Sequence, residues 1–160
     1  MNIRYIEASE KAKETLEVVR KTYFPLLENA VIKILFDTKR RVKGNRMVLG
    51  SIRKANDLIR RLTDTLAEEG CDYILFLDHI VFENISDKDK IRLVRHELRH
   101  CKVVGTPEKP KYKLIPHDIE DFVIEIELNK DDIDWAKKAS ETASLIYEQL
   151  EESKKENDNL

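Results

Sequence analysis

Two histidines four residues apart, His96 and His100, constrain this chain more than any other feature of its sequence. They lie in the segment His-Glu-Leu-Arg-His, which follows Ser86, a favourable helix N-cap, and apolar residues at helical spacing. On a helix, residues four apart lie on the same face, one turn from each other. Two imidazoles placed in this way can bind one zinc ion, Zn2+, through nitrogen. The segment therefore predicts a metal-binding helix.

Glu97 follows the first of these histidines and is the candidate catalytic base. A zinc ion lowers the pKa of water into the neutral range, and a neighbouring carboxylate can accept the proton as the water attacks a carbonyl group. The pattern therefore predicts metal-assisted hydrolysis of a peptide bond. A non-enzymatic zinc-binding scaffold is the alternative, and the intact Glu97 argues against it because a structural site needs no base.

A catalytic zinc site usually has three protein ligands, so one more ligand has to come from elsewhere in the chain. Thr106, six residues after His100, excludes the spacing in which a third histidine follows at that distance. His117 is the next candidate. The break at Gly105 and the prolines that follow it leave the chain room to return beside the metal-binding helix.

Other residues could take part in the site or be mistaken for ligands. Asp118 and Glu120 are alternative third ligands, and Glu120 or Asp121 could instead accept a hydrogen bond from a ligand ring. His79 ends a predicted strand and has no second candidate ligand at metal spacing. Thiolate ligation by Cys101 is chemically possible, but its neighbours predict a small buried apolar residue.

Periodicity along the rest of the chain predicts an α+β fold with a small sheet packed against the metal-binding helix. The predicted strands are 30–36, 47–52 and 73–77, with 78–82 possibly still extended. The predicted helices are 7–23, one capped by Asn56 and ending at Gly70, the metal helix running from Ser86 to just before Gly105, one starting near Pro116, and 131–155. Residues 106–113 are predicted to form a loop. We expect one domain over residues 1–155 and a polar tail over 156–160.

The length of 160 residues suits one domain with one core. No apolar run approaches the roughly 20 residues that span a bilayer, and the first residues lack the apolar core of a secretory signal. These features predict a cytoplasmic protein that does not enter a membrane. Cys71 and Cys101 are then expected to be reduced.

Charge is distributed unevenly along the chain. Residues 39–61 hold nine lysines and arginines against one acid, whereas residues 118–160 hold fourteen acids against five lysines. Such polarity can mark a nucleic-acid-binding side, so weak, non-specific DNA binding through residues 39–61 is one hypothesis. The alternative is two solvated faces of one domain.

The motifs together resemble those of the phage-type metallopeptidases, small single-domain zincins of bacteria and their phages that are similar in style to SprT-like proteases. The resemblance extends from about Arg46 to about Phe122. It is carried by the segments 50–55, 72–77, 85–87, 95–101 and 117–122. The last two fit the pattern His-Glu-Leu-x-His-Cys followed by His-Asp-apolar-Glu-acid-Phe.

This resemblance implies a zincin-like domain in which His96, His100 and His117 bind zinc and Glu97 is the catalytic base. It implies a protein or peptide substrate, and a nucleic-acid-associated, SprT-like protease is a further alternative. The helix predicted after Asp131 and the charged tail lie outside the matching motifs, so the resemblance assigns them no function.

Overall fold

The computed structural model describes residues 3–118, 120 and 122–158 of the chain. The fold is mixed α+β, as predicted. It divides into two compact units, Met1–Pro116 and His117–Leu160, which are described separately here. The expectation of one domain over residues 1–155 stays a prediction.

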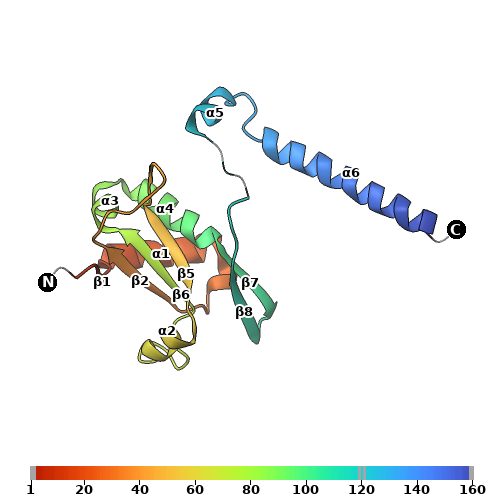
Figure 1. Ribbon diagram of the computed structural model, residues 1–160. Helices are drawn as coiled ribbons and strands as arrows, with labels where there is room; N and C mark the ends of the chain where they lie inside the picture. Colours follow the sequence, from red (N-terminus) through yellow and green to blue (C-terminus); the bar gives the residue numbers. More distant parts are fainter. Residues whose placement is uncertain (1–2, 119, 121, 159–160) are drawn as a thin grey trace. The chain divides into compact units, whose positions relative to one another are not determined.

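A four-stranded sheet forms the centre of the first unit, in the order β1-β2-β6-β5 (Figure 1). Its strands are β1 (Tyr5–Glu7), β2 (Ile32–Asp37), β5 (Gly50–Lys54) and β6 (Tyr73–Asp78). Strands β2 and β6 run parallel, and the other two pairs are antiparallel. The predictions of β2 and β6 are confirmed. The strand predicted at 47–52 is instead divided between β4 (Arg46–Met47) and β5. Strand β4 pairs with β3 (Val42–Lys43) across a turn at Gly44.

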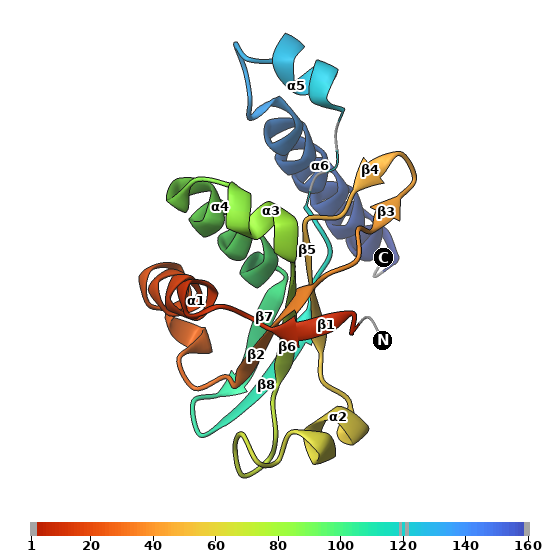
Figure 2. The ribbon, with the colours of Figure 1, turned by 90° about the vertical axis from the view of Figure 1, so that its left-hand side faces the viewer.

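Two helices, α1 (Glu10–Tyr23) and α4 (Asp87–Arg99), cover one face of this sheet (Figure 2). Each begins at a serine cap: Ser9 accepts a hydrogen bond from the Ala12 amide, and Ser86 accepts one from the Asp89 amide. Alternate strand residues point toward the helices and form the core with the apolar helix positions. This core includes Leu16 and Val19 of α1, Phe36, Leu75 and Leu77 of the sheet, and Val94 and Leu98 of α4. The core therefore fixes the metal-binding helix against the sheet.

The chain leaves α4 at Arg99 and enters a hairpin formed by β7 (Cys101–Thr106) and β8 (Lys109–Leu114). The prediction that the helix continues almost to Gly105 is wrong, as is the prediction of a loop at 106–113. Gly105 adopts a φ of 89°, and a Cβ atom there would lie 2.7 Å from the carbonyl oxygen of Lys109. Only glycine fits this position of the hairpin without strain.

Three short helices complete the first unit, namely α2 (Asp57–Leu62), α3 (His79–Asn84) and the 3-10 helix Pro25–Leu27. Asn56 caps α2, as predicted, by accepting a hydrogen bond from the Ile59 amide at 2.9 Å. The predicted end at Gly70 is wrong, because α2 ends at Leu62. The possible extension of the strand signal over 78–82 is not observed, because the Asp78 side chain accepts a hydrogen bond from the Val81 amide at 2.9 Å and starts α3.

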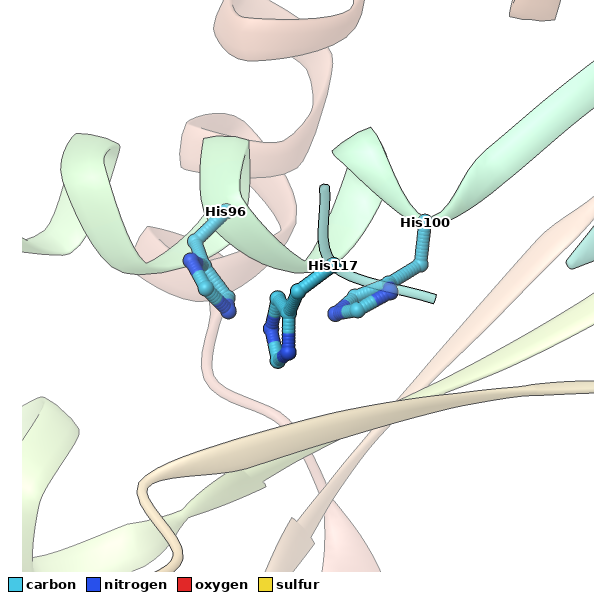
Figure 3. A group of neighbouring side chains, drawn as sticks. All are labelled: His96, His100 and His117. Atoms are coloured by element: carbon cyan, nitrogen blue, oxygen red, sulfur yellow. The ribbon is translucent and has the colours of Figure 1, made fainter. Parts of the chain in front are cut away.

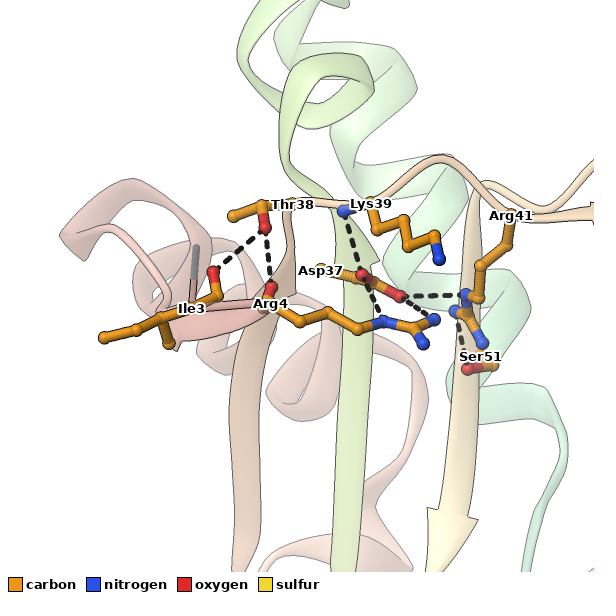
Figure 4. A network of polar contacts seen from close by, with 7 residues as sticks. All are labelled: Ile3, Arg4, Asp37, Thr38, Lys39, Arg41 and Ser51. Atoms are coloured by element: carbon orange, nitrogen blue, oxygen red, sulfur yellow. Dashed lines mark hydrogen bonds and ion pairs between the residues drawn. The ribbon is translucent and has the colours of Figure 1, made fainter. Parts of the chain in front are cut away.

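Asp37, at the end of β2, is buried and is held by two arginines (Figure 4). Arg4 donates two hydrogen bonds of 3.1 Å to its carboxylate, and Nε of Arg41 lies 3.0 Å from the same group. Burial alone would raise the pKa of Asp37, but hydrogen bonds from Arg4 and the Lys39 amide, with the two positive charges, hold it below its ordinary value. Arg41 also donates to Ser51 of β5, so this network joins the strands at one end of the sheet.

The second unit contains α5 (Val123–Leu128) and α6 (Trp135–Asp158). The helix predicted from Pro116 begins only at Val123, and Ile119, one of its expected residues, lies outside the described residues. The last helix is confirmed, with a start four residues later than predicted. Neither helix of this unit, nor any other in the described chain, has the length and apolar character needed to cross a membrane.

Candidate metal centre

The last turn of α4 presents His96 and His100 on one side of the helix, as their spacing predicts. Their ring centroids lie 5.5 Å apart, with the ring planes at 77° to each other. His96 is exposed and His100 is half-buried, so this side of the helix is open to solvent. The two rings therefore lie near the surface, on a helix that packs against the apolar core.

His100 is fixed by the residue that follows β8. The Ile115 amide donates to the carbonyl oxygen of His100 at 2.8 Å, and Nδ1 of the His100 ring lies 2.7 Å from the carbonyl oxygen of Ile115. Because a carbonyl oxygen only accepts, Nδ1 carries the proton of this bond, and Nε2 is the ring nitrogen that could bind a metal ion. These bonds extend the pairing of β7 with β8 by one step, beyond Cys101 and Leu114.

His117 follows two residues after Ile115 and completes the group (Figure 3). One ring nitrogen from each of His96, His100 and His117 can be chosen so that all three lie within 4.8 Å of one another. The hairpin returns the chain to the end of α4, which is how a residue seventeen positions after His100 reaches it. Oε1 of Glu120 lies 3.6 Å from Nδ1 of His117, where it can orient the ring of this histidine.

The donor chemistry of this group fits a metal ion. Three imidazoles are a frequent ligand set of catalytic zinc, and Zn–N bonds of about 2.0–2.1 Å require the three nitrogens to surround one point. Ligation needs a neutral ring, and of the two neutral tautomers of His100 the carbonyl partner favours the one with its proton on Nδ1. The group could therefore hold a metal ion with a coordination position left for water or substrate.

Two other candidates stand apart from this group. The His79 ring stacks on Phe36, with centroids 4.8 Å apart. Cys101 is predicted to be a small buried residue but is only partly buried against the core; burial raises the pKa of its thiol to about 12, so the thiol stays protonated. Cys71 and Cys101 are both free, in agreement with the expected reduced state.

Glu97 points inward from the same turn of α4 and is only 6% exposed. Burial raises the pKa of its carboxyl group, while the nearby charges of His100 and Arg41 oppose that rise. Its carboxylate lies against Gly50 of β5: a Cβ atom on Gly50 would approach Oε1 of Glu97 and the carbonyl oxygen of Phe76 at 3.2 Å each. The side chain is therefore confined between α4 and the edge of the sheet.

The family described as "Putative phage metallopeptidase" matches residues 3–144. The chain belongs to this family. The match includes α4, the hairpin and the first part of α6, and so covers every residue of the histidine group. No curated protein and no solved structure gives a match to the chain. A metallopeptidase needs a bound metal ion, and the three histidines are a group within the described residues that could hold one.

The sequence alone does not reveal two residues that shape this centre. Ile115 acts only through its backbone, and no residue type signals a backbone carbonyl beside a ligand ring. Gly50 was noted as part of the family pattern but not as a neighbour of Glu97, because the pairing of β5 with β6 was not predicted in that register.

Proposed function

We propose that this chain is a zinc-dependent peptidase of the zincin type, with His96, His100 and His117 as the metal ligands and Glu97 as the general base. The observation that carries the proposal is the convergence of three imidazole nitrogens within 4.8 Å beside a buried carboxylate. The family supports a metallopeptidase activity. The test is hydrolysis of an unstructured protein such as casein by the zinc-loaded chain, compared with its Glu97→Gln variant.

Each residue has a distinct part in this mechanism. A zinc ion held by the three histidines supplies the Lewis acidity that polarises a peptide carbonyl and acidifies water. Glu97 accepts a proton from the attacking water and later returns it to the leaving amine. Burial raises the pKa of Glu97 above its ordinary value, the direction that favours proton uptake by this carboxylate. Ile115 holds the His100 ring in the tautomer that presents Nε2 to a metal ion.

The alternative is a scaffold that binds metal without catalysis. Burying a carboxylate is unfavourable for stability, and a structural zinc site has no use for one beside its ligands. The burial of Glu97 therefore favours the enzyme over the scaffold.

The contact between Gly50 and Glu97 gives a prediction for this mechanism. In Gly50→Ala, the added methyl group meets a backbone carbonyl on one side and the Glu97 side chain on the other, so the carboxylate has to shift by some tenths of an ångström. We expect hydrolysis to fall by roughly ten- to a hundredfold, because small displacements of a catalytic group reduce rates to this extent. Zinc content should stay near one per chain. The rate of casein hydrolysis and the zinc content are measured on the same preparation.

Gly44→Ala is the matched control, since Gly44 lies in the β3–β4 turn with nothing within 4 Å of an added Cβ atom. Its φ of 62° makes alanine strained there, so this variant should lose about 1 kcal/mol of stability without losing activity. Unchanged hydrolysis by Gly50→Ala would show that the position of Glu97 against β5 has no role in turnover.

Association with nucleic acid is a second candidate function, and the charge of the first unit favours it. Residues 1–116 contain 24 lysines and arginines against 17 acids, whereas residues 117–160 contain 5 against 14. Three arginines of the basic segment 39–61 already have partners: Arg41 pairs with Asp37, Arg60 with Asp72 and Arg61 with Asp64. Less of that segment is available to phosphates than its composition suggests.

A denser group of cations lies on the β7–β8 hairpin. Lys102, Lys109, Lys111 and Lys113 are exposed, and none of them forms an ion pair within the described chain. Lys102 and Lys113 stand directly opposite each other, an arrangement that is unfavourable without an anionic partner. Lys109, Lys111 and Lys113 also line an open cleft of about 890 Å³ that reaches Lys54 of β5, but this cleft is lined by Glu68, Glu69 and Glu108 as well. The lysine-bearing face of the hairpin is therefore better suited to a phosphate backbone than the cleft is.

We expect Lys111→Gln/Lys113→Gln to weaken binding to a short DNA duplex and to reduce the slope of log affinity against log salt concentration by about 2, one unit per lost phosphate contact. Arg40→Gln/Lys43→Gln removes the same charge from the segment 39–61 and should have a smaller effect. Fluorescence anisotropy across a salt series measures both. An absence of binding by the wild-type chain at low ionic strength would rule out this second function.

A further inference from the structure

Helix α6 separates its charged residues from its uncharged residues around its circumference. When Ala136 is taken as position a of a heptad, positions a, d, e and g from Trp135 to Ser153 hold no charge. The a and d positions form a seam made of Ala136, Ala139, Ala143, Ile146, Leu150 and Ser153. The charged residues of this stretch all fall at b, c and f, namely Lys137, Lys138, Glu141, Glu148, Glu151 and Glu152. This is the pattern of a helix that packs against another helix.

The large residues of the seam are exposed within the described chain. Ile146 is 52% exposed and Leu150 is 53% exposed, and α6 is 24 residues long, or roughly 36 Å. A helix of this length with an uncharged face gains little stability unless that face is covered.

The seam is complementary to itself when a second copy runs in the opposite direction. With Ala143 placed level with Ile146 of the second copy, Ala139 lies level with Leu150 and Ala136 with Ser153. Each large residue then faces an alanine, which is the alternation that fills an interface between two helices. A parallel pairing would instead set alanine against alanine and leave the large residues to face each other.

The distribution of charge along α6 favours the same direction. The first half, from Trp135 to Ile146, has Lys137 and Lys138 with one acid, and the second half, from Tyr147 to Asp158, has five acids with two lysines. An antiparallel pair places the basic end of each helix beside the acidic end of the other, and a parallel pair brings the two acidic ends together.

We propose that α6 is a homodimerisation element, which pairs with α6 of a second copy of this chain as an antiparallel two-helix coiled coil. The proposal does not depend on the peptidase activity, because it uses none of the residues assigned to the metal centre. A two-fold axis relates the copies, so the same seam serves both.

The first test measures the mass of the full chain by light scattering over a dilution series. We expect about twice the chain mass of 18.8 kDa at high concentration, falling to one chain on dilution. Ile146→Glu places a charge in the seam and should raise the dissociation constant at least tenfold. Leu145→Glu is the matched control: its side chain is 60% exposed, at position c, and the variant should dimerise like the wild type. Far-ultraviolet circular dichroism reports whether each variant has kept its fold.

The second test determines direction by disulfide formation. A mixture of Ala139→Cys and Leu150→Cys chains should form a cross-link between positions 139 and 150, and neither variant alone should do so to a comparable extent. Wild-type chain, with its native Cys71 and Cys101, measures the background. The proposal is overturned if the wild type is a monomer at every concentration, if Leu145→Glu and Ile146→Glu dissociate the dimer equally, or if Ala139→Cys cross-links efficiently with itself.

Discussion

Replacing any one of His96, His100 and His117 by alanine is expected to remove most of the zinc from the purified chain. The wild type should hold about one zinc ion per chain, because a three-histidine group has the ligand number of a catalytic site. Removing one of three ligands leaves a two-nitrogen site, so occupancy after dialysis should fall to a small fraction of the wild-type value. Elemental analysis of dialysed protein measures this directly.

His79→Ala is the control for this series, because His79 stacks on Phe36 and lies outside the histidine group. It should keep full zinc occupancy. Glu120→Gln should keep the site but weaken it by about ten- to a hundredfold, the usual effect of losing a partner of a ligand ring. Full occupancy in all three histidine variants would contradict the metal centre, and a larger loss in Glu120→Gln than in His117→Ala would transfer the third ligand to Glu120.

The spacing of His96 and His100 was sufficient to predict a shared helix face, because helical geometry alone places residues four apart together. His117 was selected as third ligand by elimination and by the expectation that the chain returns after Gly105. The structure places its ring in the group, but the return is made by a hairpin and not by the predicted loop. The register of a hairpin depends on backbone pairing, which side-chain periodicity does not specify.

The end of α4 shows why the fold was only partly predictable. Cys101 continues the apolar spacing of Val94 and Leu98, so the pattern fits a longer helix as well as the observed strand. Tertiary contacts favour the strand over a longer helix, because pairing with β8 satisfies the backbone hydrogen bonds of β7 and Tyr112 packs into the core. Exposed lysines alternate with the buried Tyr112, which is the two-residue period of a strand. The two prolines of this segment favoured the prediction of a loop in spite of that period.

The sequence shows the charge asymmetry along the chain, but it does not show which surface of the fold holds the exposed basic residues. A run of basic residues along the chain does not form one surface, because Arg41 and Arg60 turn toward Asp37 and Asp72. The lysines of the hairpin, which are alternate residues of a strand, do share a face. The DNA-binding hypothesis for residues 39–61 therefore stays a prediction, and the hairpin is the surface that would carry most of the contact.

Glu97→Gln is expected to abolish peptide hydrolysis while leaving the metal and the fold in place. The amide has nearly the shape of the carboxylate but cannot accept a proton from water, so the rate should fall by about 10²- to 10⁴-fold. Zinc occupancy should stay at the wild-type value, because Glu97 is not a member of the ligand group. The melting temperature should be unchanged or higher, since burial disfavours the charged form of Glu97 and glutamine carries no charge. Casein hydrolysis, elemental analysis and thermal unfolding on one preparation give the three values.

The three values together separate the enzyme from the scaffold. A wild-type chain that holds zinc but cleaves neither casein nor a mixture of short peptides would favour the scaffold. Equal hydrolysis by wild type and Glu97→Gln would assign the proton transfer to another group. Loss of zinc in Glu97→Gln would instead make Glu97 a determinant of metal binding, which the geometry of three converging histidines does not require. Glu97 is buried against Gly50, whereas His96 faces solvent and belongs to the histidine group. Because the carboxylate and the histidine group are separate, we expect Glu97→Gln to reduce hydrolysis without reducing zinc occupancy.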